Sequence, residues 1–504
     1  MDYSSLYKSI ELILPELAVS ISLVVLVIAD LIWDKNKKYI PFIALLGLLI
    51  TILYVIGQFG TEGFAFIYSE NNPNNYGILA IDNFGGFFKL IVIVSSILIV
   101  YFSLRSDEIQ KTIDRSGEYF ALIFGMIVGM MVMISAVDLI VIYLALELLS
   151  LSSYVLAGFT KLRDRNAEAS LKYLIFGAVS SGIMLFGISI LYGLTGSTNL
   201  YVINDVIRST NLNVLLVSFS SILIFAGVGY KISAAPFHFW TPDVYEGAPI
   251  SITAYLSVAS KAAGFALLVR IVRTGFVNYA DEFGNWELMP AFDWQLLLIV
   301  VSVLTMTLGN FAALWQDNLK RMLAYSSIAH AGYLMLGLVV LSDQGVLAIL
   351  IYFVFYLLMN LGAFYIVMII ANKTGSEEID DYNGLGSKFP FFGVALTIFL
   401  ISLTGLPPTA GFIGKLYIFM ALIDAKMIAV AVIAILNSVV SLYYYIRVLK
   451  HMYLVKAPEN LGADTSSLSD KIFVGILLVP ILFFGVYFSP VINFAKSCIN
   501  LLGF

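Results

Sequence analysis

Residues 212–246 read LNVLLVSFSSILIFAGVGYKISAAPFHFWTPDVYE, and this stretch decides the fold. Its 35 residues would form a straight helix of about 52 Å, whereas the hydrocarbon layer of a membrane is about 30 Å thick. Gly227, Gly229 and Pro236 lie at its middle, and proline removes an amide donor and clashes with the preceding turn. A break survives inside a membrane only where protein or a watery cavity satisfies the freed backbone groups. The stretch therefore predicts a broken transmembrane helix, with Lys231 at the break.

A second stretch has the same character. Residues 389–423 are also 35 long, and their middle reads LTGLPPTAGFIGK, which ends at Lys415. We expect a second broken helix here.

Composition places the rest of the chain in the membrane. Of its 504 residues 60% are apolar and 12% are charged, and the mean hydropathy is +0.94. Soluble domains carry about 25% charged residues. We count roughly 14 spans from the length that a membrane helix needs. They begin near Ile10, Ile40, Phe84, Glu118, Asp138, Ala167, Leu212, Ser251, Gln295, Met322, Gly345, Phe389, Met427 and Lys471. The acidic residues near the N-terminus indicate that the first helix is a retained span and not a cleaved signal.

Basic residues predict the orientation. If the N-terminus is outside, 17 of the 28 lysines and arginines lie in cytoplasmic loops and 6 on the opposite side. This asymmetry is typical of membrane proteins and puts both termini outside. The other five (28 − 17 − 6) fall inside spans and are Lys89, Lys172, Lys231, Lys261 and Lys415. Lys89 and Lys172 are near helix ends, so we expect Lys89 to extend to the interface, whereas for Lys172 this and a functional role stay open.

Several titratable side chains share one predicted depth. Glu147 lies about 14 Å into its span, Lys261 about 15 Å and His330 about 14 Å. Lys231 and Lys415 lie at the breaks. Because a charge at the bilayer centre costs at least about 2.5–3.5 kcal/mol, these residues predict an ion pathway, although a buried ion pair with structural hydrogen bonds is the alternative.

The chain has no residues for redox chemistry of its own. Cys498 is the only cysteine, and His238, His330 and His451 fall on separate segments, so we expect no iron–sulfur cluster, haem or metal. No dinucleotide or phosphate-binding glycine motif is present. The net charge of −5 predicts no nucleic-acid partner.

A faint internal repeat organises the single all-α membrane domain. ELLSLSSYVLAGF at 147–159 resembles AYSSIAHAGYLMLGL at 324–338, and the broken helices recur five spans apart. An odd-numbered unit must be inverted in its second copy, as in secondary transporters. We expect three N-terminal helices (1–112), a first five-helix repeat (113–276), a second inverted repeat (290–457) and a C-terminal helix (468–504).

Seven blocks then resemble subunit N of bacterial NADH–quinone oxidoreductase (respiratory complex I). They run in family order and read LPELAVSISL (14–23), LELLSLSSYVLAGF (146–159), EASLKYLIFGA (168–178), KISAAPFHFWTPDVYEGAP (231–249), SVASKAAGFALL (257–268), KRMLAYSSIAHAGYLMLG (320–337) and LTGLPPTAGFIGKLYIF (403–419). The TPDVYEGAP loop is similar to subunit N rather than to subunits L and M.

The resemblance implies a role for each matched residue. Glu147 looks like the acidic partner in the fifth helix, and Lys231 like the lysine of the broken seventh. Lys172 matches a lysine of the sixth helix, Lys261 the connecting lysine of the eighth, and Lys415 the terminal proton carrier of the twelfth. His330 and His238 complete the candidate proton-translocation residues.

The resulting hypothesis is a proton-translocating subunit of NADH–quinone oxidoreductase in the bacterial inner membrane. Movement of Glu147 relative to Lys231 would push a proton through Lys261 to Lys415. The resemblance implies M-, K- and J-type neighbours, with NADH, FMN, iron–sulfur clusters and quinone on partner subunits and no cofactor here. A stand-alone cation/proton antiporter and a non-conducting scaffold are the alternatives.

Overall fold

Long apolar helices make up almost the whole structure, because few polar side chains interrupt the apolar sequence. The computed structural model describes residues 3–33, 37–67, 76–160, 164–290, 292–457 and 466–503. Lys35, Lys161 and Arg163, three of the basic loop residues, lie outside the described residues.

The helices follow in chain order. The N-terminal part contains α1 (Tyr3–Leu12), α2 (Leu14–Ile32), α3 (Ile40–Gln58), α4 (Asn83–Arg105) and α5 (Asp107–Gln110). The next part contains α6 (Ser116–Ser135), α7 (Leu139–Ala157), α8 (Asp164–Thr195), α9 (Leu200–Ser209), α10 (Val214–Ile232), α11 (Trp240–Gly247), α12 (Ile250–Tyr255) and α13 (Lys261–Phe276). The third part contains α14 (Trp294–Ala313), α15 (Leu319–Val339), α16 (Asp343–Thr374), α17 (Leu385–Lys388), α18 (Pro390–Thr404), α19 (Ala410–Asp424) and α20 (Ile428–Leu454). The chain closes with α21 (Leu468–Val486) and α22 (Ser489–Lys496).

In the described residues, thirteen helices are long and apolar enough to cross a membrane. They coincide with the predicted spans except for the one expected near Phe389. At that place two helices of 15 residues, α18 and α19, follow each other. At the predicted seventh span α10 ends at Ile232, and α11 begins only at Trp240.

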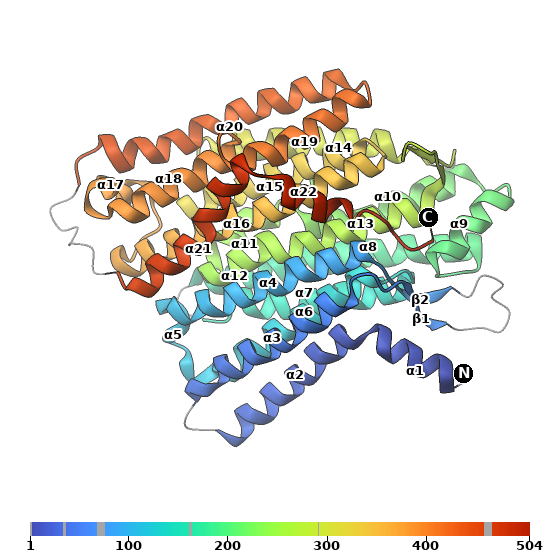
Figure 1. Cartoon of the computed structure of the whole chain (residues 1–504), viewed down its shortest axis with the longest axis horizontal. Coiled ribbons are helices and arrows are strands. Elements are labelled where there is room, and N and C mark those ends of the chain that lie inside the picture. Colours follow the sequence, from blue (N-terminus) through green and yellow to red (C-terminus); the bar gives the residue numbers. More distant parts are fainter. Residues whose placement is uncertain are drawn as a thin grey trace.

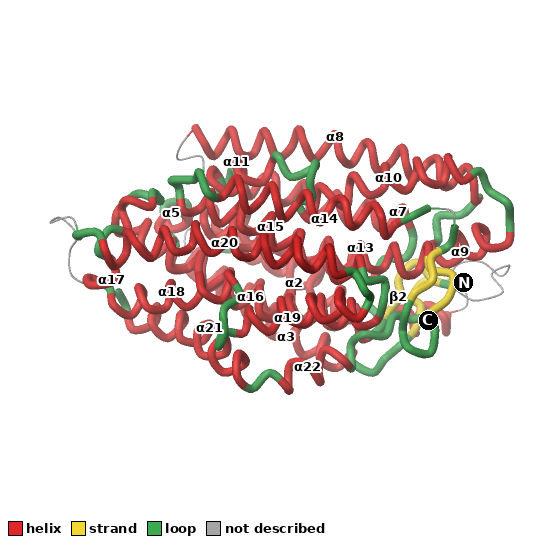
Figure 2. Tube along the Cα trace, turned by 90° about the horizontal axis from the view of Figure 1, so that it is seen from above, coloured by secondary structure: helices red, strands yellow, loops and turns green. Residues whose placement is uncertain are grey.

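The two ends of the bundle differ. Two antiparallel hairpins, β1 (Gly63–Ile67) with β2 (Gly77–Ile81) and β3 (Val277–Ala280) with β4 (Trp286–Leu288), were not predicted. α9 joins them, because Asn199 donates a hydrogen bond to Gly77 O and Asn204 donates one to Val277 O. Both termini lie at this end, whereas α5 and α17 lie at the other (Figures 1 and 2).

Two pairs of helices, α6 with α7 and α14 with α15, pack through equivalent glycine contacts. A Cβ on Gly129 of α6 would lie 2.7 Å from Leu149 N of α7, and a Cβ on Gly309 of α14 would lie 2.6 Å from Ala329 N of α15. Both the glycines (309 − 129) and the facing residues (329 − 149) are 180 apart. Only a residue without a side chain allows helices to approach this closely.

The turns that follow α8 and α16 also match. After α8, Ser197 N donates to the Thr195 hydroxyl and Leu139 N to Thr198 O. After α16, Ser376 N donates to the Thr374 hydroxyl and Leu319 N to Glu377 O. The first turn lies beside α9 and the second beside α17, at opposite ends of the bundle (Figure 1).

Candidate functional site

Lys231 lies in the last turn of α10, where the helix ends. Ser233 has φ +63°, in the left-handed region, so the chain leaves the helix there. The Lys231 side chain is buried, and its ammonium donates to Ser150 Oγ of α7 at 3.2 Å. It also lies 5.8 Å from the centre of the Tyr173 ring of α8. Lys231 is therefore held by a hydroxyl and an aromatic face.

Glu147, the predicted acidic partner, lies one turn before Ser150 on α7. No ion pair within 4.0 Å joins it to Lys231 in the described part of the chain. Its Oε1 atom is buried and has no hydrogen-bond partner among the described residues. The Ser150 hydroxyl, one turn after Glu147 on the same helix, therefore makes the contact that Glu147 was expected to make.

Side chains bond backbone groups at the end of α10 and in the segment that joins it to α11. Trp240 Nε1 donates to Tyr230 O at 3.1 Å, and Ala235 N donates to Thr305 Oγ1 at 2.9 Å. If α10 continued, Ala235 N would donate to a carbonyl of the helix; here Thr305 on α14 accepts from it instead. His238, also in the break, is buried, and its Nδ1 has no partner among the described residues.

Lys261 begins α13, directly after a π-helical turn at Leu256–Ser260. Such turns inside α-helices are frequent at functional sites. The Lys261 ammonium is buried and donates to both Ser327 O at 2.7 Å and Ser327 Oγ at 2.9 Å. This contact joins the span of α12 and α13 to α15.

His330 lies one turn beyond Ser327 on the same helix. Its Nδ1 is 2.6 Å from the Tyr352 hydroxyl of α16, and its Nε2 is 3.5 Å from the Tyr445 hydroxyl of α20. The imidazole is buried and has a hydroxyl at each nitrogen. It therefore continues the polar line from Lys261 toward the last helices.

Lys415 lies on α19, beside the end of α18. Its buried ammonium donates to Thr404 O at 2.7 Å and to Ser438 Oγ at 2.9 Å. It also lies 4.6 Å from the centre of the Tyr333 ring of α15. Thr404 is the last residue of α18, so the cation meets the carbonyl end of a helix, where positive charge is favoured.

Lys172 lies away from this line. Its ammonium pairs with Asp243 at 2.6 Å and with Glu168 at 2.7 Å, and the side chain is partly exposed. These pairs belong to a set of ionic contacts that we call the clasp. The clasp consists of Arg165, Glu168, Lys172, Asp243, Glu246, Lys320, Arg321 and Glu377.

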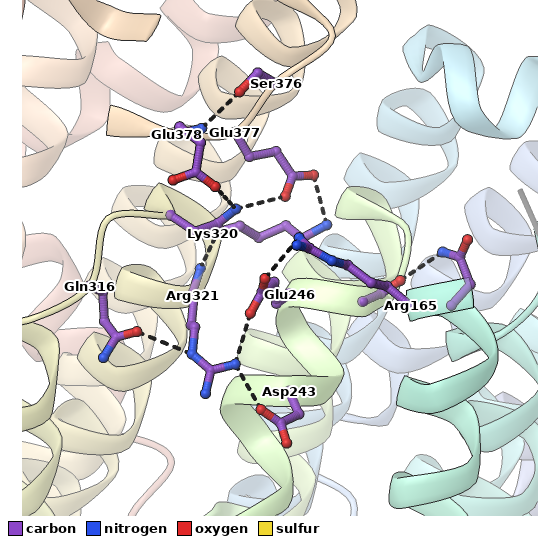
Figure 3. Close-up of polar contacts among 12 residues, drawn as sticks. Arg165, Asp243, Glu246, Gln316, Lys320, Arg321, Ser376, Glu377 and Glu378 are labelled. Carbon is purple, nitrogen blue, oxygen red and sulfur yellow. Dashed lines mark hydrogen bonds and ion pairs between the residues drawn. The ribbon is translucent and has the colours of Figure 1, made fainter. Parts of the chain in front are cut away.

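The clasp holds α11 between α8 and α15. Arg321 of α15 reaches both acidic residues of α11, at 2.7 Å from Asp243 and 2.7 Å from Glu246 (Figure 3). Arg165 of α8 also contacts Glu246, at 3.0 Å. The buried Lys320 ammonium donates to Ala248 O and pairs with Glu377, each at 2.9 Å.

Lys89 corrects a prediction. It does not extend to the interface but is buried, and it pairs with Glu16 of α2 at 2.7 Å and donates to Gln58 Oε1 of α3 at 3.0 Å. The expectation was wrong because its distance from the helix end gave no information about a carboxylate on another helix. By contrast, Lys231, Lys261 and Lys415 have no carboxylate within 4.0 Å in the part of the chain that the structure describes.

Sequence reasoning missed the hydroxyls that bind these cations. Ser150, Ser327, Ser438, Tyr352 and Tyr445 carry no charge, and serine and tyrosine are common in this chain, so their positions gave no signal. Ser150 and Ser327 lie within the blocks that resemble subunit N, but nothing in those blocks distinguishes them from the other serines. No cluster of metal-ligating side chains is found in the described ranges.

The bundle and its buried lysines define an antiporter-like integral membrane protein. The family model described as NADH:quinone oxidoreductase/Mrp antiporter, TM matches residues 136–441, more than half of the chain. Two relatives named NADH-quinone oxidoreductase subunit N extend the match. That of Chlorobium chlorochromatii is 43% identical over 99% of this chain and 96% of its own length. Subunit N 2 of Chloroherpeton thalassium is 45% identical over 97% and 94%.

A solved structure agrees with these relatives. A chain in respiratory complex I from Thermus thermophilus is 29% identical, with a TM-score of 0.77, and the match covers 96% of this chain and 99% of that one. The chain belongs to the family of NADH-quinone oxidoreductase N subunits.

Proposed function

We propose that protons cross this subunit of NADH–quinone oxidoreductase along Glu147, Lys231, Lys261, His330 and Lys415. The observation that carries the proposal is that three lysines are buried in the membrane domain without a carboxylate in contact. An ionised group at this depth costs at least about 2.5–3.5 kcal/mol, and a structural role would favour a paired charge, as at Lys89. Hydroxyls and carbonyls can bind either protonation state of a lysine, so each site can exchange a proton.

The contacts supply an order for the transfer. Lys231 contacts Ser150, one turn after Glu147 on α7, so a rotation of either charged side chain would bring the two groups together or move them apart. A carboxylate in contact favours the charged lysine, whereas its withdrawal favours proton release. Lys261 is tied to Ser327, one helical turn from His330, and His330 contacts the Tyr352 and Tyr445 hydroxyls. Tyr445 lies on α20, the helix whose Ser438 binds Lys415.

We also propose that the chain contains two inverted five-helix repeats, at 113–276 and 290–457. The matching glycine contacts and the matching turns at opposite ends support this. In this scheme α10 with α11, and α18 with α19, are the broken seventh and twelfth spans. Lys231 binds Ser150 and Tyr173 in the first copy. The corresponding positions in the second copy are His330 (330 − 150 = 180) and Tyr352 (352 − 173 = 179), so the same place in each copy holds a polar centre.

Energy for transport must come from partners, since this chain offers no redox group by its sequence. The Thermus complex is a multi-subunit respiratory assembly, which supports placement in a membrane arm. We propose M-, K- and J-type subunits as neighbours, NADH, FMN, iron–sulfur clusters and quinone on partner subunits, and no cofactor in this chain. The location proposed is the bacterial inner membrane, with both termini in the periplasm. His238 and Lys172 are proposed to assist at the break and at the clasp.

The test is a Lys231→Ala variant in native membrane vesicles. We expect the proton-to-electron ratio of NADH oxidation to fall, since Glu147 loses its cation and the path loses its first base. Lys111→Ala is the matched control, because Lys111 is an exposed lysine beyond α5. A proton-to-electron ratio in Lys231→Ala equal to that of the wild type would contradict the proposed path.

A further inference from the structure

A cavity of about 310 Å³ opens where α3, α4, α5 and α6 meet, at the end of the bundle opposite the termini. Lys37 and Lys38 line it, together with Gln110, Thr112 and Ser116. Its floor contains the buried hydroxyls of Ser103 and Tyr119, which bond each other at 2.8 Å. No acidic side chain is among the described residues that line the cavity. The cavity therefore favours an anion.

The N-terminus of α6 adds to this preference. Ser116, its first residue, lines the cavity, and the preceding Arg115 provides no side-chain cap. The first amides of a helix have no partner within the helix, and together with the helix dipole they attract phosphate groups. A carboxylate also lies at this turn, because a Cβ on Gly117 would lie 2.0 Å from Asp30 Oδ1. Asp30 pairs with Lys37 at 2.8 Å and Glu118 with Arg115 at 2.7 Å, so these four charges offset one another. Lys38 is exposed and has no carboxylate within 4.0 Å among the described residues.

The outer face of α3 shows what the anion is attached to. Phe42, Leu46, Leu49 and Leu53 follow at steps of four, three and four residues, and each is more than half exposed. They form one apolar stripe that begins beside the cavity and extends about 16 Å. That length is about half of the hydrocarbon thickness of about 30 Å, the depth of one leaflet. Exposed Trp33 and Tyr39 lie at the end of the stripe, with ring centres 6.3 Å apart, as expected at a membrane–water interface.

We propose that this cavity binds the headgroup of an anionic phospholipid, with the phosphate at Lys37, Lys38 and the α6 amides and an acyl chain along the α3 stripe. Basic pockets between helices bind such headgroups in other membrane proteins. The site lies on the N-terminal helices, away from the lysine line, so it does not depend on the proton path.

The experiment uses the complex extracted from native membranes and measures bound phospholipid by native mass spectrometry, with labelled phosphatidylglycerol as the probe. Lys37→Gln/Lys38→Gln should lower phosphatidylglycerol affinity at least tenfold, and Lys38→Gln alone, which keeps the pair with Asp30, should give a smaller loss. The control is Lys388→Gln/Lys450→Gln, which removes two exposed charges of α17 and α20 and leaves the cavity lining unchanged.

Three results would overturn the proposal. These are equal retention in the cavity and control variants, equal binding of phosphatidylcholine by the wild-type complex, and displacement of the lipid by inorganic phosphate alone. The last result would show an anion site that does not recognise the lipid.

Discussion

Lys89 and Lys261 are equally buried, but their partners differ in kind. Lys89 faces a carboxylate and an amide, so its charge is compensated in one fixed arrangement. Lys261 faces a serine hydroxyl and a carbonyl, which compensate a charge only in part. The first environment favours a permanent ion pair. The environment of Lys261 can hold the lysine in either protonation state, as the proposed proton carrier requires.

This difference predicts opposite responses to neutralisation. Lys89→Met leaves Glu16 buried without a cation, and breaking a buried pair costs about 3–5 kcal/mol. We expect the variant to assemble poorly and to unfold at a lower temperature in detergent. Glu16→Gln/Lys89→Met removes both charges and should recover most of the stability, with normal proton pumping. A double variant as unstable as the single one would show that the pair has another role.

At the residue scale the sequence predicted the charged groups and missed the neutral ones. The estimated depth in the membrane made Lys261 and His330 candidate residues, because a titratable residue in the middle of an apolar span is conspicuous. The structure places them beside Ser327 and Tyr352, respectively, in two hydrogen bonds that both involve α15. The hydroxyl partners depend on how distant helices pack, which spacing along one helix does not encode. The failed expectation for Lys89 has the same origin.

At the scale of elements, Gly405 shapes the turn between α18 and α19. It has φ +88°, and a Cβ there would lie 2.7 Å from Lys415 Cδ. Gly405→Ala should therefore add about 1–2 kcal/mol of backbone strain and displace the lysine. We expect lower stability together with a lower proton-to-electron ratio.

The control for this variant is Gly182→Ala. Gly182 lies within α8 with no atom near its Cβ position, and alanine is favoured over glycine in a helix by about 0.5–1 kcal/mol. That variant should be as stable as the wild type or more so. Normal pumping by Gly405→Ala would mean that the Lys415 position tolerates displacement.

α11 is the element most dependent on the clasp. It has only eight residues and follows the break at 233–239, so its position rests on its contacts with α8 and α15. Arg321→Gln would free Asp243 and Glu246 from their shared cation, and hydrogen bonds to charged groups contribute about 1.5–3 kcal/mol. We expect amide hydrogen exchange in α11 to speed up about tenfold or more.

The matched control is Arg115→Gln, which breaks an exposed pair with Glu118. Exposed pairs contribute about 0–1 kcal/mol, so exchange in α11 should not change. Equal exchange in the Arg321 variant and the wild type would show that apolar packing alone fixes α11.

Elements with a strong apolar pattern were predicted, and those without one were not. The thirteen spans follow from hydropathy alone. The breaks expected near Pro236 and Pro408 stay a prediction, with which the ends of α10 at Ile232 and of α18 at Thr404 agree. The hairpin of β1 and β2 and the helix α9 lie in the less apolar stretches at 63–81 and 200–209, where neither apolar length nor residue spacing marked them. Their order comes from contacts such as that of Asn199 with Gly77, made between distant segments.

At the scale of the whole molecule, the bundle has two unlike ends. Both termini, the two hairpins and α9 gather at one end, and α5 and α17 lie at the other (Figure 1). Glu377 of the clasp lies between α16 and α17. The turn after α8 belongs to the first end and the turn after α16 to the second, as expected of inverted copies. In the proposed repeats, Ile140 and Thr198 stand at the positions of Lys320 and Glu377 (320 − 140 = 180; 377 − 198 = 179), so this ion pair of the clasp has no equivalent in the first repeat. In that proposal the two repeats share a scaffold and differ in their charged groups.

The excess of basic residues in alternate loops predicts which end faces the cytoplasm, and single-cysteine labelling in a Cys498→Ser background tests it. Tyr7→Cys and Asn500→Cys report on the end with the termini, and Gln110→Cys reports on the other; all three positions are exposed. In intact cells with a permeabilised outer membrane, an impermeant maleimide should label the first two variants. Gln110→Cys should react only in inverted inner-membrane vesicles, because lysines and arginines retain loops in the cytoplasm during insertion. The reverse labelling pattern would show the opposite orientation in the membrane, with the clasp on the periplasmic side.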